Sequence, residues 1–154
     1  MKRYYLAYGS NLNIEQMRYR CPRAKVMGTS MIPGYELLFK GSRTGAYLTI
    51  EKKEGGMVPV AVWEVTEKDE KALDRYEGYP AFYYKAGADI TYIGLKTGKE
   101  YEAKGFIYIM HEERQIGKPT LWYVRSCLEG YRSFGFDDGY LMKAVERSGG
   151  YEEW

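Results

Sequence analysis

Residues 3–13 read RYYLAYGSNLN, and this stretch predicts how the chain enters its fold. Residues 3–8 are rich in aromatic side chains, which favour the extended backbone, so they predict a first β-strand. Residues 9–11, Gly-Ser-Asn, should end that strand, because all three residue types form tight turns. Asn13 is a typical helix N-cap, so we expect a short helix that starts there and ends before Pro22.

The rest of the chain mixes short extended segments with helices. Further strands are expected within residues 24–40, 46–52, 57–65, 82–94 and 100–110. The segments 46–52 and 57–65 should form a hairpin closed by the Glu-Gly-Gly turn at residues 54–56. Further helices are expected at residues 66–77, from 120 to 131, and from 137 or 138 to 147.

These elements predict a single α+β domain over residues 1–148, followed by a polar tail at residues 149–154. Most strands should pair antiparallel, in a barrel or a strongly curved sheet. The length of 154 residues fits one domain, and 45% hydrophobic with 29% charged residues is typical of globular proteins. A disordered chain, a collagen-like repeat and a coiled coil are thereby excluded.

The net charge and the distribution of apolar residues exclude further classes of protein. No apolar run approaches the roughly 18 residues of a membrane span, so we expect no membrane association, and the start lacks the apolar core of a secretory signal. The net charge is only +2, from 23 basic and 21 acidic residues, which argues against nucleic-acid binding. Cys21 and Cys127 form no metal or redox motif, so a reduced, cytoplasmic setting is expected.

The turn after the first strand is the first candidate site. It comprises Tyr8, Gly9, Ser10, Asn11 and Leu12 and leads directly into a capped helix. Consecutive backbone N–H groups in such a turn can converge on an anion, and the serine and asparagine add polar side chains. The alternative is a tight strand-to-helix turn with no ligand.

Glu77 is the second candidate. The helix that carries it should begin at an N-cap, Thr66, and stop at Gly78. Glu77 would then lie in the last turn, at the negative end of the helix dipole and at the margin of the apolar stripe. Both placements raise a carboxyl pKa, which suits a proton shuttle near neutral pH. The alternative is a solvated terminal residue paired with Arg75.

Other chemical signals are weaker. His111 is the only histidine, and we interpret it as a solvated loop residue. A Cys–His nucleophile has no local support, and buried inert cysteines are common. The sequence contains no nucleophile elbow, P-loop or dinucleotide fingerprint, so neither a metal nor another cofactor is expected.

The two candidates together resemble the γ-glutamyl cyclotransferase-like family. The resemblance rests on Tyr-Gly-Ser-Asn-Leu at residues 8–12 and Leu-Asp-x-x-Glu-Gly at residues 73–78. Further segments that resemble the family are Met17-x-x-Arg20-x-Pro22, Pro33-Gly34-Tyr35, Tyr79-Pro80 with Tyr83 and Lys85, and Pro119-Thr120-x-x-Tyr123 followed by Gly130. Thr120 departs mildly from the serine of the family pattern. The match spans most of residues 4–140.

The resemblance implies a small mixed β-barrel with flanking helices and a cavity for a γ-glutamyl group. It also implies that residues 8–12 grip that group, that Glu77 is the acid/base, and that Tyr123 supplies a pocket hydroxyl. The expected reaction is attack of the substrate α-amine on its own γ-carbonyl, which gives 5-oxoproline and expels the amine partner. An intramolecular reaction of this kind needs no covalent nucleophile and no metal.

Two other functions stay open at this point. One is a small-ligand binding or regulatory domain in which Glu77 is only a ligand contact. The other is a tailoring cyclotransferase that removes a γ-glutamyl protecting group from a toxin or antibiotic. The sequence identifies neither the amine that leaves nor an oligomeric state. Arg43, within the loop 41–45, could meet a substrate carboxylate, but a solvated loop arginine is the simpler interpretation.

The chain contains 17 tyrosines, an excess that the resemblance to this family helps to interpret. Tyrosine rings can stack on nucleic-acid bases, but the low net charge argues against that role. A tyrosine can instead line a cavity with its ring and present a hydroxyl to a polar substrate. Tyr8 and Tyr123 are therefore candidate site residues, whereas most of the others are expected to pack.

Overall fold

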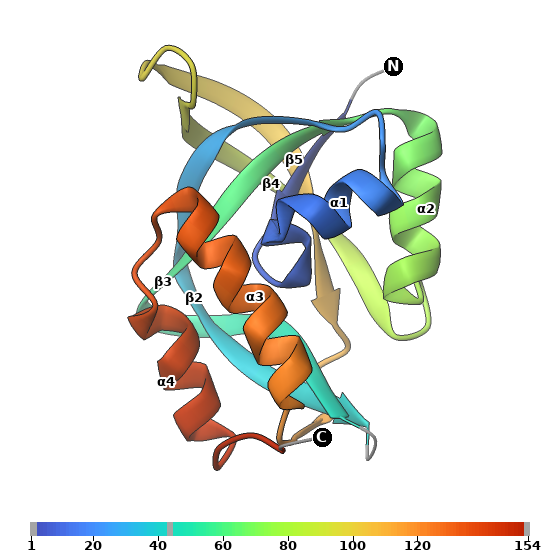
Figure 1. The fold of residues 1–154 in the computed structure, drawn as a ribbon, viewed down its shortest axis with the longest axis vertical. Coiled ribbons are helices and arrows are strands. Elements are labelled where there is room, and N and C mark those ends of the chain that lie inside the picture. Colours follow the sequence, from blue (N-terminus) through green and yellow to red (C-terminus); the bar gives the residue numbers. More distant parts are fainter. Residues whose placement is uncertain (1–2, 43–44, 153–154) are drawn as a thin grey trace.

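A barrel of β-strands forms the centre of the protein in the computed structural model, which describes residues 3–42 and 45–152 (Figure 1). The strands are β1 (Arg3–Ala7), β2 (Lys25–Ser42), β3 (Gly45–Val65), β4 (Tyr83–Gly94), β5 (Glu100–Met110) and β6 (Gln115–Ile116). The helical elements are a 3-10 turn η1 (Ser10–Leu12) and the helices α1 (Ile14–Arg20), α2 (Glu67–Glu77), α3 (Leu121–Phe134) and α4 (Gly139–Arg147).

Five strands close the barrel. Their order is β3-β1-β5-β4-β2, with β6 beyond β2, and β2 also pairs with β3 to complete the ring. The pairing of β1 with β5 is parallel, whereas the other strand pairs are antiparallel. The predicted fold class, a mixed and largely antiparallel barrel with flanking helices, is therefore confirmed.

The predicted hairpin between residues 46–52 and 57–65 is wrong. Both segments belong to the single long strand β3, and both pair with β2 rather than with each other. The turn-forming residues 54–56 make a bulge in β3 instead of a reversal. A Cβ on Gly56 would lie only 2.3 Å from the carbonyl oxygen of Tyr35, so glycine allows the two strands to approach here.

The ends of α2 agree with the sequence prediction. Thr66 Oγ1 accepts a hydrogen bond from the Asp69 N–H at 3.2 Å, and Asp69 Oδ2 accepts one from the Thr66 N–H at 3.1 Å. This reciprocal capping box fixes the start of the helix. Gly78 ends it in the left-handed region, at φ 66° and ψ 38°, where a side chain would be strained. Glu77 is therefore the last residue of α2.

The C-terminal helices cover the barrel and the turn after β1. α3 runs to Phe134, three residues beyond the expected Tyr131, because Gly135 supplies its left-handed cap. It packs against η1, and a Cβ on Gly130 would lie 2.5 Å from the Leu12 Cβ, so this contact requires glycine. α4 packs on β2. In the part of the chain that the structure describes, no helix is long and apolar enough to cross a membrane.

The described part of the polar tail is held against α3. The Glu152 N–H donates to the Pro119 carbonyl at 2.8 Å, and the Leu121 N–H donates to the Glu152 carbonyl at 2.6 Å. These bonds extend the backbone beyond residue 148 along the start of α3.

Candidate functional site

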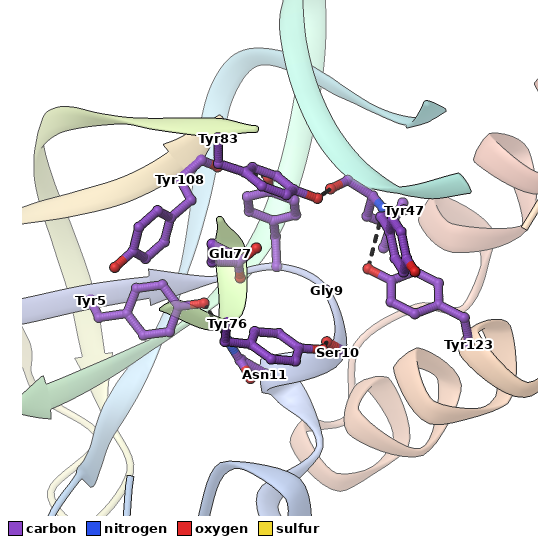
Figure 2. Close-up of a pocket in the computed structure, with 12 residues that line it drawn as sticks. Tyr5, Gly9, Ser10, Asn11, Tyr47, Tyr76, Glu77, Tyr83, Tyr108 and Tyr123 are labelled. Atoms are coloured by element: carbon purple, nitrogen blue, oxygen red, sulfur yellow. Dashed lines mark hydrogen bonds between the residues drawn. The ribbon is translucent and has the colours of Figure 1, made fainter. Parts of the chain in front are cut away.

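A cavity of about 200 Å³ lies where β1, the last turn of α2 and the N-terminal half of α3 converge (Figure 2). It is lined by Tyr5, Tyr8, Gly9, Ser10, Asn11, Tyr47, Leu48, Tyr76, Glu77, Tyr83, Tyr108 and Tyr123. Seven of these residues are tyrosines, and Glu77 is the only ionisable residue of another type. No lysine or arginine of residues 3–42 and 45–152 lines the cavity.

The turn after β1 forms one wall of the cavity. Its backbone bends at Gly9, whose carbonyl accepts a hydrogen bond from the Leu12 N–H at 3.0 Å. A Cβ on Gly9 would lie 3.3 Å from the Tyr123 hydroxyl, so a side chain here would crowd the cavity. The N–H groups of Ser10 and Asn11 begin the 3-10 turn and have no acceptor among the described residues. They are available to a ligand oxygen.

Glu77 faces this turn from the end of α2. The residue keeps some exposed surface because it borders the cavity, but its carboxyl group is enclosed by protein atoms. This burial raises the pKa of the Glu77 carboxyl from its ordinary 4.5 to about 8, and the positive charge of Arg20 opposes the rise. No hydrogen bond to the carboxylate is found from any residue that the structure describes. The group can therefore exchange a proton near neutral pH.

Hydrogen bonds to the backbone fix the rings across the cavity. The Tyr8 hydroxyl donates to the Tyr108 carbonyl at 2.7 Å, and the Tyr83 hydroxyl donates to the Leu48 carbonyl at 2.8 Å. The Tyr123 hydroxyl accepts from the Leu48 N–H at 3.2 Å. Burial raises the pKa of the Tyr8, Tyr83 and Tyr123 hydroxyls well above the ordinary value. They stay neutral, so the cavity wall holds hydroxyl groups rather than phenolates.

Side chains of the turn are held by two further tyrosines. Asn11 Nδ2 donates to the Tyr5 hydroxyl at 2.9 Å, and the Ser10 hydroxyl shares a 2.9 Å hydrogen bond with the Tyr76 hydroxyl (Figure 2). The second of these bonds joins the turn after β1 to the residue that precedes Glu77. The two walls of the cavity are thus linked directly.

Six of the seven predicted site residues line this one cavity: Tyr8, Gly9, Ser10, Asn11, Glu77 and Tyr123. Leu12 does not. Its side chain is fully buried against Gly130 of α3, and its N–H is used by the Gly9 carbonyl. The 3-10 turn thus places this residue in the core rather than at the cavity, and its contact with a ligand stays a prediction.

Sequence reasoning missed six of the cavity residues, which are Tyr5, Tyr47, Leu48, Tyr76, Tyr83 and Tyr108. They come from β1, β3, α2, β4 and β5, and the closure of the barrel decides which face of each strand turns inward. The tyrosine excess was the available signal, but composition alone does not tell which rings turn inward.

The other candidates lie outside the cavity. His111 Nε2 is 2.8 Å from the Pro80 carbonyl oxygen, in a loop, and does not line the site. Cys21 and Cys127 are free and buried, and burial raises the pKa of each thiol to about 12, so neither is an activated nucleophile. No group of three or more potential metal ligands occurs within the described ranges. Arg43 lies outside the described residues.

Comparison with known proteins agrees with this geometry. The family model described as "Gamma-glutamyl cyclotransferase, AIG2-like" matches residues 5–127. The chain belongs to this family. Human gamma-glutamylcyclotransferase is 26% identical over 151 residues, covering 92% of this chain and 78% of the human protein. The protein of the same name from Bos taurus is 29% identical over 146 residues, covering 90% and 75%.

Solved structures of other proteins share the fold. A structure of a gamma-glutamyl cyclotransferase superposes with a TM-score of 0.75 at 24% identity, covering 94% of this chain and 86% of that one. YkqA from Bacillus subtilis superposes with a TM-score of 0.76 at 16% identity, covering 99% of this chain and 56% of YkqA. The match to this family and the two relatives named gamma-glutamylcyclotransferase support gamma-glutamyl cyclotransferase activity for this protein.

Proposed function

We propose that the protein converts a γ-glutamyl amide to 5-oxoproline and a free amine or amino acid, with Glu77 as the acid/base. The observation that carries the proposal is a buried carboxyl with a pKa of about 8, which faces a small cavity walled by neutral hydroxyls and free N–H groups. Such a carboxyl can both accept and return a proton within one turnover.

In the proposed reaction, Glu77 removes a proton from the substrate α-ammonium. The freed amine nitrogen attacks the γ-carbonyl carbon, and a C–N bond forms while the bond to the leaving nitrogen breaks. Glu77 returns its proton to that leaving nitrogen. The α-nitrogen loses two protons overall, and the amine leaves as an ammonium ion that carries both of them. Holding the α-amine beside the γ-carbonyl supplies up to roughly 7–11 kcal/mol of the barrier reduction.

Neutral donors would bind the substrate oxygens. Ser10 and Asn11 line the cavity, and their N–H groups would suit the α-carboxylate or the oxyanion that develops on the γ-carbonyl. The Tyr123 hydroxyl, which reaches from α3 to the neighbourhood of Gly9, would add a further donor (Figure 2).

The size of the cavity supports a small acyl group. Its volume of about 200 Å³ is below the roughly 300–1,000 Å³ of pockets for drug-sized ligands. We infer that the γ-glutamyl group is enclosed and that the leaving amine extends toward the mouth, where Tyr47 and Tyr76 are partly exposed.

Release of 5-oxoproline from a panel of γ-glutamyl amino acids and γ-glutamyl amines tests the proposal. Glu77→Gln should lower kcat by about 10²–10⁴-fold, because it removes the proton carrier and keeps the shape. Glu54→Gln, an exposed glutamate on β3, is the matched control and should behave as the wild type. Turnover that persists in Glu77→Gln would exclude its acid/base role. Binding of the panel without any turnover would favour a ligand-binding domain instead.

A further inference from the structure

Arg20 stands immediately behind the site without lining the cavity. It is the last residue of α1 and is half-buried. Its Nη1 donates to Asn11 Oδ1 at 2.5 Å, and its Nη2 donates to Gln16 Oε1 at 2.8 Å. Its guanidinium carbon lies 3.7 Å from the centroid of the Tyr76 ring, in a stacked cation–π contact.

Both cavity residues that Arg20 contacts are connected to further cavity residues. Asn11 also contacts Tyr5, because its Nδ2 donates a hydrogen bond to the Tyr5 hydroxyl at 2.9 Å. Tyr76 also contacts Ser10, because the hydroxyls of the two residues share a 2.9 Å hydrogen bond. One guanidinium therefore fixes the orientation of side chains from β1, from the turn after β1 and from α2. These three segments form the part of the cavity wall that contains Glu77 and its neighbours.

These contacts depend on the shape of arginine. The guanidinium is planar and presents several N–H groups in a fixed fork, so it can stack on one ring while donating to two amide oxygens. A lysine keeps the charge but cannot make the same stacked and forked arrangement. Charge and geometry can therefore be separated by substitution.

We propose that Arg20 is a positioning residue for the reaction, which holds Asn11 and Tyr76 in place in the part of the cavity wall next to Glu77 and adds a positive charge near that carboxylate. The positive charge favours the ionised form of Glu77 and so lowers the pKa of the carboxyl, whereas burial raises it. The proposal rests on the proposed function, because it assumes that Glu77 cycles between its two protonation states.

The remaining titratable groups that face Glu77 do not supply an alternative cation. They are the hydroxyls of Tyr5, Tyr8, Tyr76, Tyr83, Tyr108 and Tyr123, from β1, its following turn, α2, β4, β5 and α3. Burial is the largest cause that raises the pKa of each hydroxyl, so all six are neutral where Glu77 titrates. Arg20 is the cation whose field acts on Glu77 within the described residues.

Titration of Glu77 in the free protein tests the charge directly. The full-length protein is labelled with ¹³C-glutamate, and the Glu77 carboxyl signal is assigned by its loss in Glu77→Gln. In Arg20→Gln the midpoint should move to higher pH than in the wild type, whereas in Arg20→Lys it should stay near the wild-type midpoint. Arg18→Gln removes an exposed arginine from the same last turn of α1 and should change nothing.

Steady-state kinetics tests the geometry on the same variants. Both Arg20→Gln and Arg20→Lys should lose about 10²-fold in kcat, because a displacement of about 1 Å of positioned groups costs this much. The acid limb of the pH profile should shift only in Arg20→Gln. An unchanged Glu77 midpoint in Arg20→Gln overturns the proposal, and so does wild-type kcat in Arg20→Lys.

The experiments distinguish a failure of the proposed function from a failure of the proposed role of Arg20. Absence of 5-oxoproline release by the wild type contradicts the proposed function, while the titration still decides whether Arg20 acts on Glu77. If Arg20→Gln does not fold, Arg20→Lys decides through kcat and folding is checked by thermal unfolding. Loss of activity in Arg20→Lys that matches a loss of folded protein would show a purely structural role and overturn the proposal.

Discussion

Replacing Glu77 by glutamine should make the protein more stable at alkaline pH while leaving its stability at pH 4 almost unchanged. The folded pKa of Glu77 is about 8, above the ordinary value of 4.5 that we take for the unfolded chain. Between these values the folded protein holds a proton that the unfolded chain has lost, so stability falls as the pH rises. The stabilisation is fully present below 4.5 and is lost as the pH passes about 8. Glutamine resembles the protonated form and loses nothing.

The size of the effect follows from the same two pKa values. The interval from 4.5 to about 8, at about 1.36 kcal/mol per pH unit, corresponds to about 5 kcal/mol. Because Glu77 borders a cavity that water can enter, we take about half of this, roughly 2–3 kcal/mol, as the gain of Glu77→Gln at pH 9. For a domain of this length, that gain raises Tm by roughly 5–10 °C.

Thermal unfolding of the wild type and Glu77→Gln from pH 4 to pH 9 measures this difference. The two curves of Tm against pH should coincide at low pH and separate above pH 5. Glu54→Gln, at an exposed position, should follow the wild type throughout. A difference that is constant with pH, or a less stable Glu77→Gln at pH 9, would refute the reasoning, since a carboxyl with an ordinary pKa gives no such divergence.

Two further substitutions test the walls of the site. Gly130→Ala should destabilise the protein by about 1–3 kcal/mol, seen as a lower Tm, because its Cβ would meet Leu12 at 2.5 Å, whereas Gly87→Ala, with open space around it, should not. Tyr108→Phe removes the hydroxyl that donates to Asp74 Oδ1 at 2.6 Å and should cost about 1.5–3 kcal/mol in urea unfolding. A Tyr108→Phe protein as stable as the wild type would show that this hydrogen bond does not hold the end of α2.

The sequence predicted the helices whose two ends are set by residues that are neighbours in the chain. α2 was predicted because Thr66 and Asp69 form a capping box and Gly78 stops the helix, and all of these contacts involve neighbours in the chain. The strands expected at residues 82–94 and 100–110 likewise follow from local residue patterns and correspond to β4 and β5. The wrong hairpin at residues 54–56 shows the limit of such signals, because a Gly-Gly pair serves a bulge as well as a turn and only the partner strand decides which one forms.

Candidate site residues could be named from the sequence where a motif holds several of them next to one another. Gly9, Ser10 and Asn11 are adjacent, and Glu77 follows from the end of its helix, so these residues could be named before the structure was known. The burial of Leu12 could not be predicted, because the direction of its side chain depends on packing against α3, more than 100 residues further along the chain.

By itself, the sequence determined the composition of the site: a polar turn after the first strand, one glutamate at a helix end and an excess of tyrosine. Only the tertiary structure decided that seven tyrosines from seven different segments line the cavity with Glu77, and that Arg20 contacts Asn11 and Tyr76. The physical reason is that a strand presents alternate residues to opposite faces, and closure of the barrel selects which face turns inward. The raised pKa of Glu77 arises from that enclosure, because it is the assembled wall of rings that removes water from the carboxylate.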